Sequence, residues 1–273
     1  MKFKKFLILA TVFATSVFWT GCSDGGGGGG GGGLQDGATK TITAGGTSIE
    51  VVFVSAGTFS MGDRDLISVF QDLWDETPNG WGEVERQVIL TQGFWISKYP
   101  ITQAQYQAVM GTNPSFFSGR PNNPVESVNW FDAVAFSESV GGRLPTEAEW
   151  EFAARGGNRS QGFIYSGSNN LSEVGWFWEN SDWETKPVGQ KLPNELGIYD
   201  MSGNVWEWTS DWWSNFGTAS VTSPTGPNTG SDRVIRGGGW DYDAEICRVA
   251  IRGIDFPDLR WLNYGFRVAF APN

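Results

Sequence analysis

The side chains that could carry out chemistry in this chain include no histidine. Its 273 residues contain two cysteines, Cys22 and Cys247. The lack of histidine excludes His-ligated zinc and iron centres, the Ser-His-Asp triad and the Cys-His dyad. Cys22 directly follows an apolar N-terminal run, so Cys247 is the single thiol of the remaining chain and has no disulfide partner there. We therefore expect burial of apolar surface, not a disulfide, to stabilise the folded part.

The most unusual stretch lies between Asp241 and Tyr264. Its apolar residues follow neither the helical nor the strand periodicity for more than a few positions, and Gly253 and Pro257 interrupt them. An irregular loop with this much apolar surface is typical of a binding face. Arg236-Gly-Gly-Gly-Trp240 precedes it, and a period-2 pattern over 266–270 predicts a strand after it.

The N-terminus has the pattern of an export signal. Three lysines, an apolar run over 6–19 and Gly21-Cys22 resemble a bacterial lipoprotein signal over 1–21 with Cys22 as the lipidated residue. A plain signal peptide with an incidental cysteine is the alternative. Nine consecutive glycines, 25–33, predict a flexible tether over 22–48 and a folded domain over 49–273. We expect an outer-membrane or cell-surface lipoprotein, attached to the membrane through its N-terminal lipid.

The charge of the chain is strongly negative. It is −11, and loss of residues 1–21, which contain three lysines and no acidic residue, makes it −14. A surface of this sign repels phosphate backbones, so we expect no nucleic acid as a partner.

The sequence predicts that the binding face is held by a loop-rich α+β domain. β-branched and aromatic residues predict strands over 49–59 and 88–96, and the polar segment 63–85 predicts a loop. Three helices are expected after the N-capping residues Thr102, Asn129 and Thr146, each with a polar or acidic residue three positions later.

The segment Arg143-Leu-Pro-Thr-Glu-Ala-Glu-Trp-Glu-Phe-Ala-Ala-Arg-Gly-Gly157 resembles the formylglycine-generating enzyme, or sulfatase-modifying factor, family. Further matching segments follow in the family's order at 57–62, 124–133, 197–208, 236–240 and 265–267. The resemblance implies an elaborated C-type-lectin-like fold with mixed sheets, few helices and many ordered loops.

The same resemblance argues against enzymatic activity. The family's enzymes use a cysteine pair near the motif that is here Arg248 to Arg252, and neither aligned position carries cysteine. Copper ligands and redox chemistry are then lost. Iron-dependent relatives need histidines, which the chain lacks. We expect no catalytic residue and no catalytic cofactor; an oxidase with relocated chemistry and a carbohydrate-binding lectin module are the alternatives.

The family resemblance also implies one metal site. Asp200 and Glu207, with carbonyls near Gly203 and Val205, match a structural calcium cage of the enzymes, and such oxygens suit calcium. In the alternative interpretation Asp200 caps a turn and Glu207 pairs with an arginine. Both stay open here.

Residues 239–264 more narrowly resemble the variable region of a diversity-generating retroelement's target protein, such as the treponemal variable proteins. There, adenine misreading randomises some codons and leaves others fixed. The fixed arginines here, Arg248, Arg252, Arg260 and Arg267, are expected to bind acids and carbonyls beneath the face. The expected variable, ligand-binding positions are Asp241, Tyr242, Asp243, Glu245, Ile246, Ile251, Gly253, Ile254, Asp255, Phe256, Asp258, Leu259, Trp261, Leu262 and Asn263.

The sequence thus predicts a surface-displayed, receptor- or adhesin-like lipoprotein. Its expected partners are variable protein ligands on host or neighbouring cells. Tyr242, Phe256, Leu259 and Trp261 would supply apolar anchors to these ligands.

Overall fold

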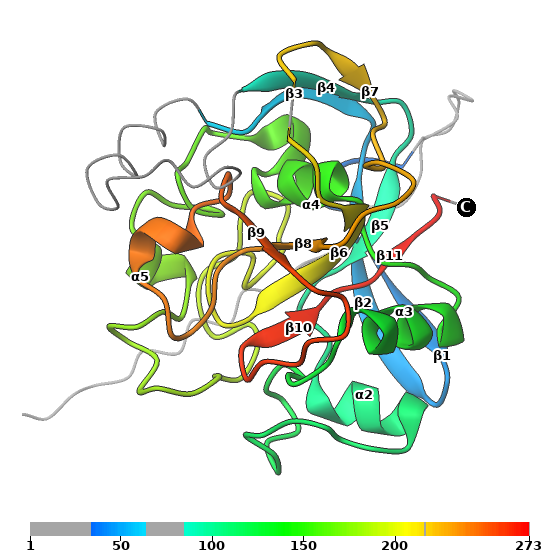
Figure 1. The fold of residues 1–273 in the computed structure, drawn as a ribbon, viewed down its shortest axis with the longest axis vertical. Helices are drawn as coiled ribbons and strands as arrows, with labels where there is room; N and C mark the ends of the chain where they lie inside the picture. Colours follow the sequence, from blue (N-terminus) through cyan, green and yellow to red (C-terminus); the bar gives the residue numbers. More distant parts are fainter. Residues whose placement is uncertain (1–33, 64–84, 216, 273) are drawn as a thin grey trace, which may run out of the picture. The chain divides into compact units, whose positions relative to one another are not determined.

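The computed structural model describes residues 34–63, 85–215 and 217–272 (Figure 1). The first sheet has the order β1-β2-β5-β11 and is antiparallel throughout. It joins both ends of the domain, because β1 (Thr39–Ala44) and β2 (Thr47–Val54) pair with β5 (Phe94–Ser97) and β11 (Ala269–Phe270).

The second half of β2 is buried on both faces of this sheet, which explains its apolar run over 51–54. Val51 and Phe53 pack in one core cluster with Tyr106 of α2 (Gln103–Met110) and Phe136 of α3 (Trp130–Ser139). The alternate residues of β2 pack in a second cluster with Phe152 of α4 (Glu147–Ala154). Alternating side chains point to opposite faces of a strand, so one strand serves both cores.

The second sheet, of order β10-β6-β8-β9, supports the face predicted from sequence. Its strands are β10 (Tyr264–Phe266), β6 (Trp206–Trp212), β8 (Arg233–Arg236) and β9 (Arg252–Asp255), of which β10 and β6 are parallel. A third sheet comprises β3 (Gly57–Met61), β4 (Arg86–Leu90) and β7 (Val221–Thr222). Short helical turns complete the fold: α5 (Leu171–Val174), η1 (Gly157–Arg159) and η2 (Ala244–Cys247).

The three predicted helix starts are confirmed. Thr102, Asn129 and Thr146 each accept a hydrogen bond from the backbone N–H three residues later, and that residue's side chain accepts one from the cap N–H in return. Gly111 ends α2 with a φ of 76°, in the left-handed region that favours glycine.

Three boundaries differ from the sequence-based expectation. The predicted tether is too long, because β1 begins at Thr39 and pairs along its whole length with β2. The predicted strand over 88–96 is two strands, β4 and β5, in different sheets. The predicted strand over 266–270 is likewise divided between β10 and β11. Most of the predicted loop over 63–85 lies outside the described residues. Within the described ranges, the helices are all too short or too polar to cross a membrane.

Candidate ligand-binding face and its scaffold

The segment 241–263 passes through η2 and β9 and then forms an irregular loop. Among the predicted ligand-binding positions, Asp243, Phe256, Asp258, Trp261 and Leu262 are exposed, and Phe256 and Trp261 are 55% and 52% exposed. Asp241, Tyr242, Glu245, Ile246, Ile254, Asp255 and Leu259 are partly exposed. These twelve positions form what we call the variable face.

Three of the predicted ligand-binding positions are not on that face. Ile251 is fully buried in the core cluster that contains Trp206. A Cβ on Gly253 would lie 2.6 Å from Ile235 Cγ1, so only glycine fits against β8. Asn263 is also buried. The prediction that these positions contact ligand is wrong, because Ile251 and Gly253 belong to the buried stretch 249–253 and Asn263 begins the buried stretch 263–270.

Two hydrogen-bonded groups hold the loop in place. Asp255 Oδ2 accepts from the Tyr264 hydroxyl at 2.7 Å and from Trp261 Nε1 at 3.1 Å. Asn263 Nδ2 donates to both carboxylate oxygens of Asp241, at 2.9 and 3.0 Å. Burial raises the pKa of Asp241, and burial together with the Asp255 carboxylate raises the pKa of Tyr264. The loop is therefore tied across its base by its own polar side chains.

The predicted role of the fixed arginines is confirmed for three of them. Arg252 binds both oxygens of Glu147, at 2.5 and 2.8 Å, and donates to the Ser214 carbonyl. Arg260, on the surface, pairs with both oxygens of Asp132. Such two-point contacts fix direction as well as distance.

The third confirmed arginine, Arg267, is fully buried between β10 and β11. It binds Glu207 through two hydrogen bonds of 2.6 and 2.7 Å and donates to the carbonyls of Ser97 and Tyr199. Arg248 differs from this group: its hydrogen bond is to Tyr165, and its buried Nε has no partner within the described structure.

Two acids of α4 that bind arginines were not predicted from the sequence. Glu147 and Glu151 lie one turn apart on α4, and both are buried. Glu151 pairs with Arg236, which also donates to the Ile251 carbonyl inside the segment 241–263. The available signal was the i,i+4 spacing of Glu147 and Glu151, which places both on the same side of α4.

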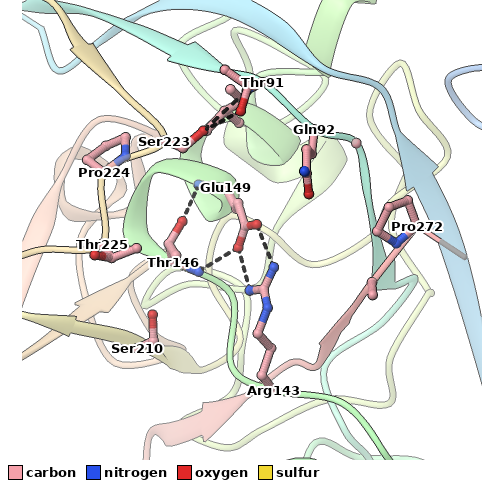
Figure 2. Close-up of a pocket in the computed structure, with 13 residues that line it drawn as sticks. Thr91, Gln92, Arg143, Thr146, Glu149, Ser210, Ser223, Pro224, Thr225 and Pro272 are labelled. Carbon is pink, nitrogen blue, oxygen red and sulfur yellow. Dashed lines mark hydrogen bonds and ion pairs between the residues drawn. The ribbon is translucent and has the colours of Figure 1, made fainter.

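A separate pocket of about 620 Å³ lies away from this segment. It is lined by the β4–β5 turn, the start of α4, the chain after β7 and the C-terminal residues, and not by the variable face. Figure 2 shows Arg143 turned onto Glu149, with two contacts of 2.6 Å, and the Thr146 cap beside them. Its charged side chains neutralise each other, so the pocket offers no unpaired charge to a ligand.

Comparison with known proteins identifies the family. Residues 38–272 match the family described as "Sulfatase-modifying factor enzyme 1-like domain". The chain belongs to this family. Among sulfatase-modifying-factor relatives, the chain is 38% identical over 216 residues to "Chaperone protein LppX" of Paenibacillus barcinonensis, covering 59% of this chain and 74% of that protein. It is 37% identical over 202 residues to the formylglycine-generating enzyme of Thermomonospora curvata, covering 66% and 64%.

A solved member of the same fold is similar over nearly its whole length. "Treponema denticola variable protein 1" superposes with a TM-score of 0.76 at 30% identity, covering 86% of this chain and 99% of that one. The predicted α+β, C-type-lectin-like fold of the formylglycine-generating-enzyme type is confirmed.

The thiol of this sulfatase-modifying-factor domain is not placed for catalysis. Cys247 is fully buried in a cluster with Tyr165, Leu171, Val174 and Phe177, and it is free. Burial raises the pKa of its thiol, with nearby Asp241 adding to the effect. A buried thiol that stays protonated is a poor nucleophile and a poor metal ligand.

The calcium cage implied by the family does not fit the side chains seen. Glu207 turns both carboxylate oxygens to Arg267, and one also accepts from Trp150 Nε1 at 2.6 Å. Asp200 has a φ of 54° and accepts from the Gly189 N–H at 2.7 Å, while burial raises its pKa to about 6. In the part of the chain that the structure describes, no cluster of three or more acidic or cysteine residues could hold a metal ion. The arginine-pair interpretation therefore fits Glu207.

Proposed function

We propose that this protein is a non-enzymatic, surface-displayed lipoprotein that binds protein ligands through the variable face, and that a retroelement diversifies this face. The observation that supports the proposal is a division within one segment. Cys247, Val249, Ala250 and Arg252, at predicted fixed positions, are buried, whereas Phe256 and Trp261, at predicted variable positions farther along the chain, are exposed. A face of this kind can change its contacts while its supports stay the same.

The fixed arginines bind the face to the rest of the domain. Arg252 is bound to α4, Arg267 to β6 and Arg260 to the first turn of α3. Each pairing joins the C-terminal segment to an element more than 50 positions away in sequence. Substitutions on the outer surface leave these contacts intact, which is the property a diversified receptor needs.

The chemistry of the face suits protein ligands. Exposed aromatic side chains next to carboxylates are typical of interfaces that bury apolar anchors within a polar rim. The reaction of the family's enzymes needs reactive thiols, and the described part of the chain contains only the buried Cys247. Both features favour binding over catalysis.

Membrane attachment rests on the N-terminal pattern. Cys22 and the glycine run lie outside the described residues, so lipidation and outer-membrane or cell-surface display are part of the proposal. A glycine tether of this length lets the domain reach away from the membrane surface.

The test exchanges the variable face. The exposed residues among 241–263 are replaced by those of a sibling protein, with Ile251, Gly253, Asn263 and the arginines kept. Ligands selected on each protein from a display library of folded domains are then compared, with circular dichroism as the check of folding. We expect each face to select its own ligands. Identical ligand sets from two folded proteins would refute the proposal.

Two further measurements address the finer claims. Sequencing of the surrounding DNA should reveal a near-copy of the codons for 239–270 that differs at adenines. Incubation of the protein and copper with a Cys-x-Pro-x-Arg peptide should leave the cysteine unchanged by mass spectrometry; formylglycine in that peptide would establish an enzyme instead.

A further inference from the structure

A tryptophan pair lies directly beside the variable face but outside the predicted variable region. The loop that carries Trp178 and Trp183 is hydrogen-bonded to Tyr242 of the face and to Trp240 just before it. Trp178 N–H donates to the Tyr242 carbonyl at 3.0 Å, and Ser181 Oγ donates to the Trp240 carbonyl at 2.8 Å. The pair and the face therefore form one continuous surface.

The two rings are displayed to solvent. Trp178 is 44% exposed and Trp183 is 57% exposed. Their centroids are 3.8 Å apart at an interplanar angle of 64°, so each ring packs on the other and not in the core. Exposing two large apolar rings together costs solvation free energy, and such exposure is typical of contact sites.

The backbone holds this arrangement at a conformational cost. Asp182 and Trp183 have φ values of 53° and 63°, in the left-handed region that non-glycine residues rarely adopt. The buried Ser181 supports them, because its Oγ also accepts from the Trp183 N–H at 3.2 Å. Strain of this kind, of order 1–3 kcal/mol per residue, persists where surrounding contacts enforce it and is concentrated at binding sites.

Acidic residues lie next to the pair along the chain. Glu179 and Asp243 are exposed, and neither has a basic partner among the described residues. Lys186, the cation of this loop, is already bound by Asp182 at 2.9 Å and Glu184 at 3.2 Å. Exposed tryptophan rings beside unpaired carboxylates attract a cation by two interactions, the cation–π interaction with the rings and the Coulomb attraction to the carboxylates.

The protein uses the same contact internally. Lys191 Nζ lies 4.0 Å from the centroid of Trp176, two positions before Trp178. Arg233 lies over the rings of Trp130 and Trp212. Over Trp178 and Trp183, by contrast, the described residues place no lysine or arginine, so the ring faces are open to a cation from outside.

We propose that Trp178 and Trp183 form a constant anchor of the ligand surface that receives a lysine or arginine side chain of a basic protein segment. The inference rests on the proposed function of the neighbouring face. The variable face then selects among ligands, while the pair supplies a contact shared by all of them. The net charge of −11 favours the same class of partner over long range.

The test measures binding of a defined basic peptide to the full-length protein. The peptide (Lys-Gly)6 is titrated by calorimetry at low salt, with (Glu-Gly)6 as the acidic counterpart and maltohexaose as a sugar. The double variant Trp178→Leu/Trp183→Leu keeps apolar bulk but removes the ring faces. We expect its Kd for the lysine peptide to be about five- to thirtyfold weaker.

Matched controls separate the possible results. Leu192→Ala, an exposed apolar residue that takes no part in these contacts, should change the Kd less than twofold. An unchanged Kd in the double variant, or equal binding of the two peptides, refutes the anchor. Binding of maltohexaose that depends on the pair, without binding of the lysine peptide, also refutes it and identifies a sugar platform. If exchanging the face leaves the selected ligands unchanged while the lysine peptide still binds through the tryptophan pair, the proposed function is refuted and the anchor is not.

Discussion

Replacing Arg267 by methionine should destabilise the protein much more than replacing Arg260 by methionine. Both arginines come from the same C-terminal stretch, and both bind a carboxylate through two contacts. They differ in burial: the side chains of Arg267 and its partner Glu207 are 0% and 1% exposed, whereas those of Arg260 and Asp132 are 45% and 22% exposed.

The magnitude follows from what remains after the substitution. Without Arg267, the Glu207 carboxylate stays buried with Trp150 Nε1 as its remaining donor, and the Ser97 and Tyr199 carbonyls each lose a donor. Removing one partner of a buried ion pair, so that the other charge stays buried alone, lowers the free energy of unfolding by about 3–5 kcal/mol. For a domain of this size that lowers Tm by roughly 6–20 °C. Loss of the exposed Arg260 pair costs about 0–1 kcal/mol, because water replaces the lost contact.

The assay is urea denaturation followed by circular dichroism, since urea does not screen charges. Arg267→Met, Arg260→Met and the double variant Arg267→Met/Glu207→Gln are compared with the unchanged protein. The double variant should recover part of the loss, because glutamine carries no charge into the core. A loss of less than about 1 kcal/mol for Arg267→Met, or a double variant less stable than that single variant, would refute the reasoning.

Three further predictions concern other positions. Gly253→Ala should lower the free energy of unfolding by about 1–3 kcal/mol, because the added Cβ would lie 2.6 Å from Ile235. Trp261→Ala, on the exposed face, should change the free energy of unfolding by less than about 1 kcal/mol. Equal urea midpoints of the two variants would contradict this. Burial raises the pKa of Asp211 from 3.8 to about 7, so its contribution to stability is present at low pH and is lost as the pH rises through 7. Between pH 4 and 8 the free energy of unfolding should therefore fall less in the Asp211→Asn variant than in the unchanged protein, and the two decreases should differ by up to about 4 kcal/mol. Parallel curves of unfolding free energy against pH would refute this. The thiol of Cys247 should resist iodoacetamide until the protein is unfolded, as read from the mass of its peptide; rapid labelling of the native protein would reopen the question of catalysis.

Local features of the fold could be read from the sequence. The capping boxes at Thr102, Asn129 and Thr146 are formed within four residues, so their outcome does not depend on distant packing. The absence of histidine is a property of composition and holds in any fold. The irregular apolar segment before Tyr264 was visible for a similar reason, because a loop that must display apolar residues departs from both regular periods.

Strand boundaries could not be read in the same way. The segments 88–96 and 266–270 are mostly apolar, with Thr91-Gln92-Gly93 and Arg267 inside them, and apolar residues indicate burial without indicating which sheet buries them. The N-terminal strand β1 was missed because its alternating polar residues lie at a sheet edge, where pairing with β2 outweighs weak local preference.

The sequence by itself excluded histidine-dependent chemistry and determined which residue types occur in the segment before Tyr264. Only the tertiary structure decided which of those residues point outward and what holds them. Arg252 and Glu147 are 105 positions apart, and the Trp178 loop reaches Tyr242 across more than 60, so no local pattern could pair them. Ile251 and Gly253 are buried, unlike Phe256 and Trp261, because Ile251 packs in the core with Trp206 and Gly253 of β9 pairs with Ile235 of β8. Side-chain direction is set by strand pairing, and strand pairing is a property of the whole fold.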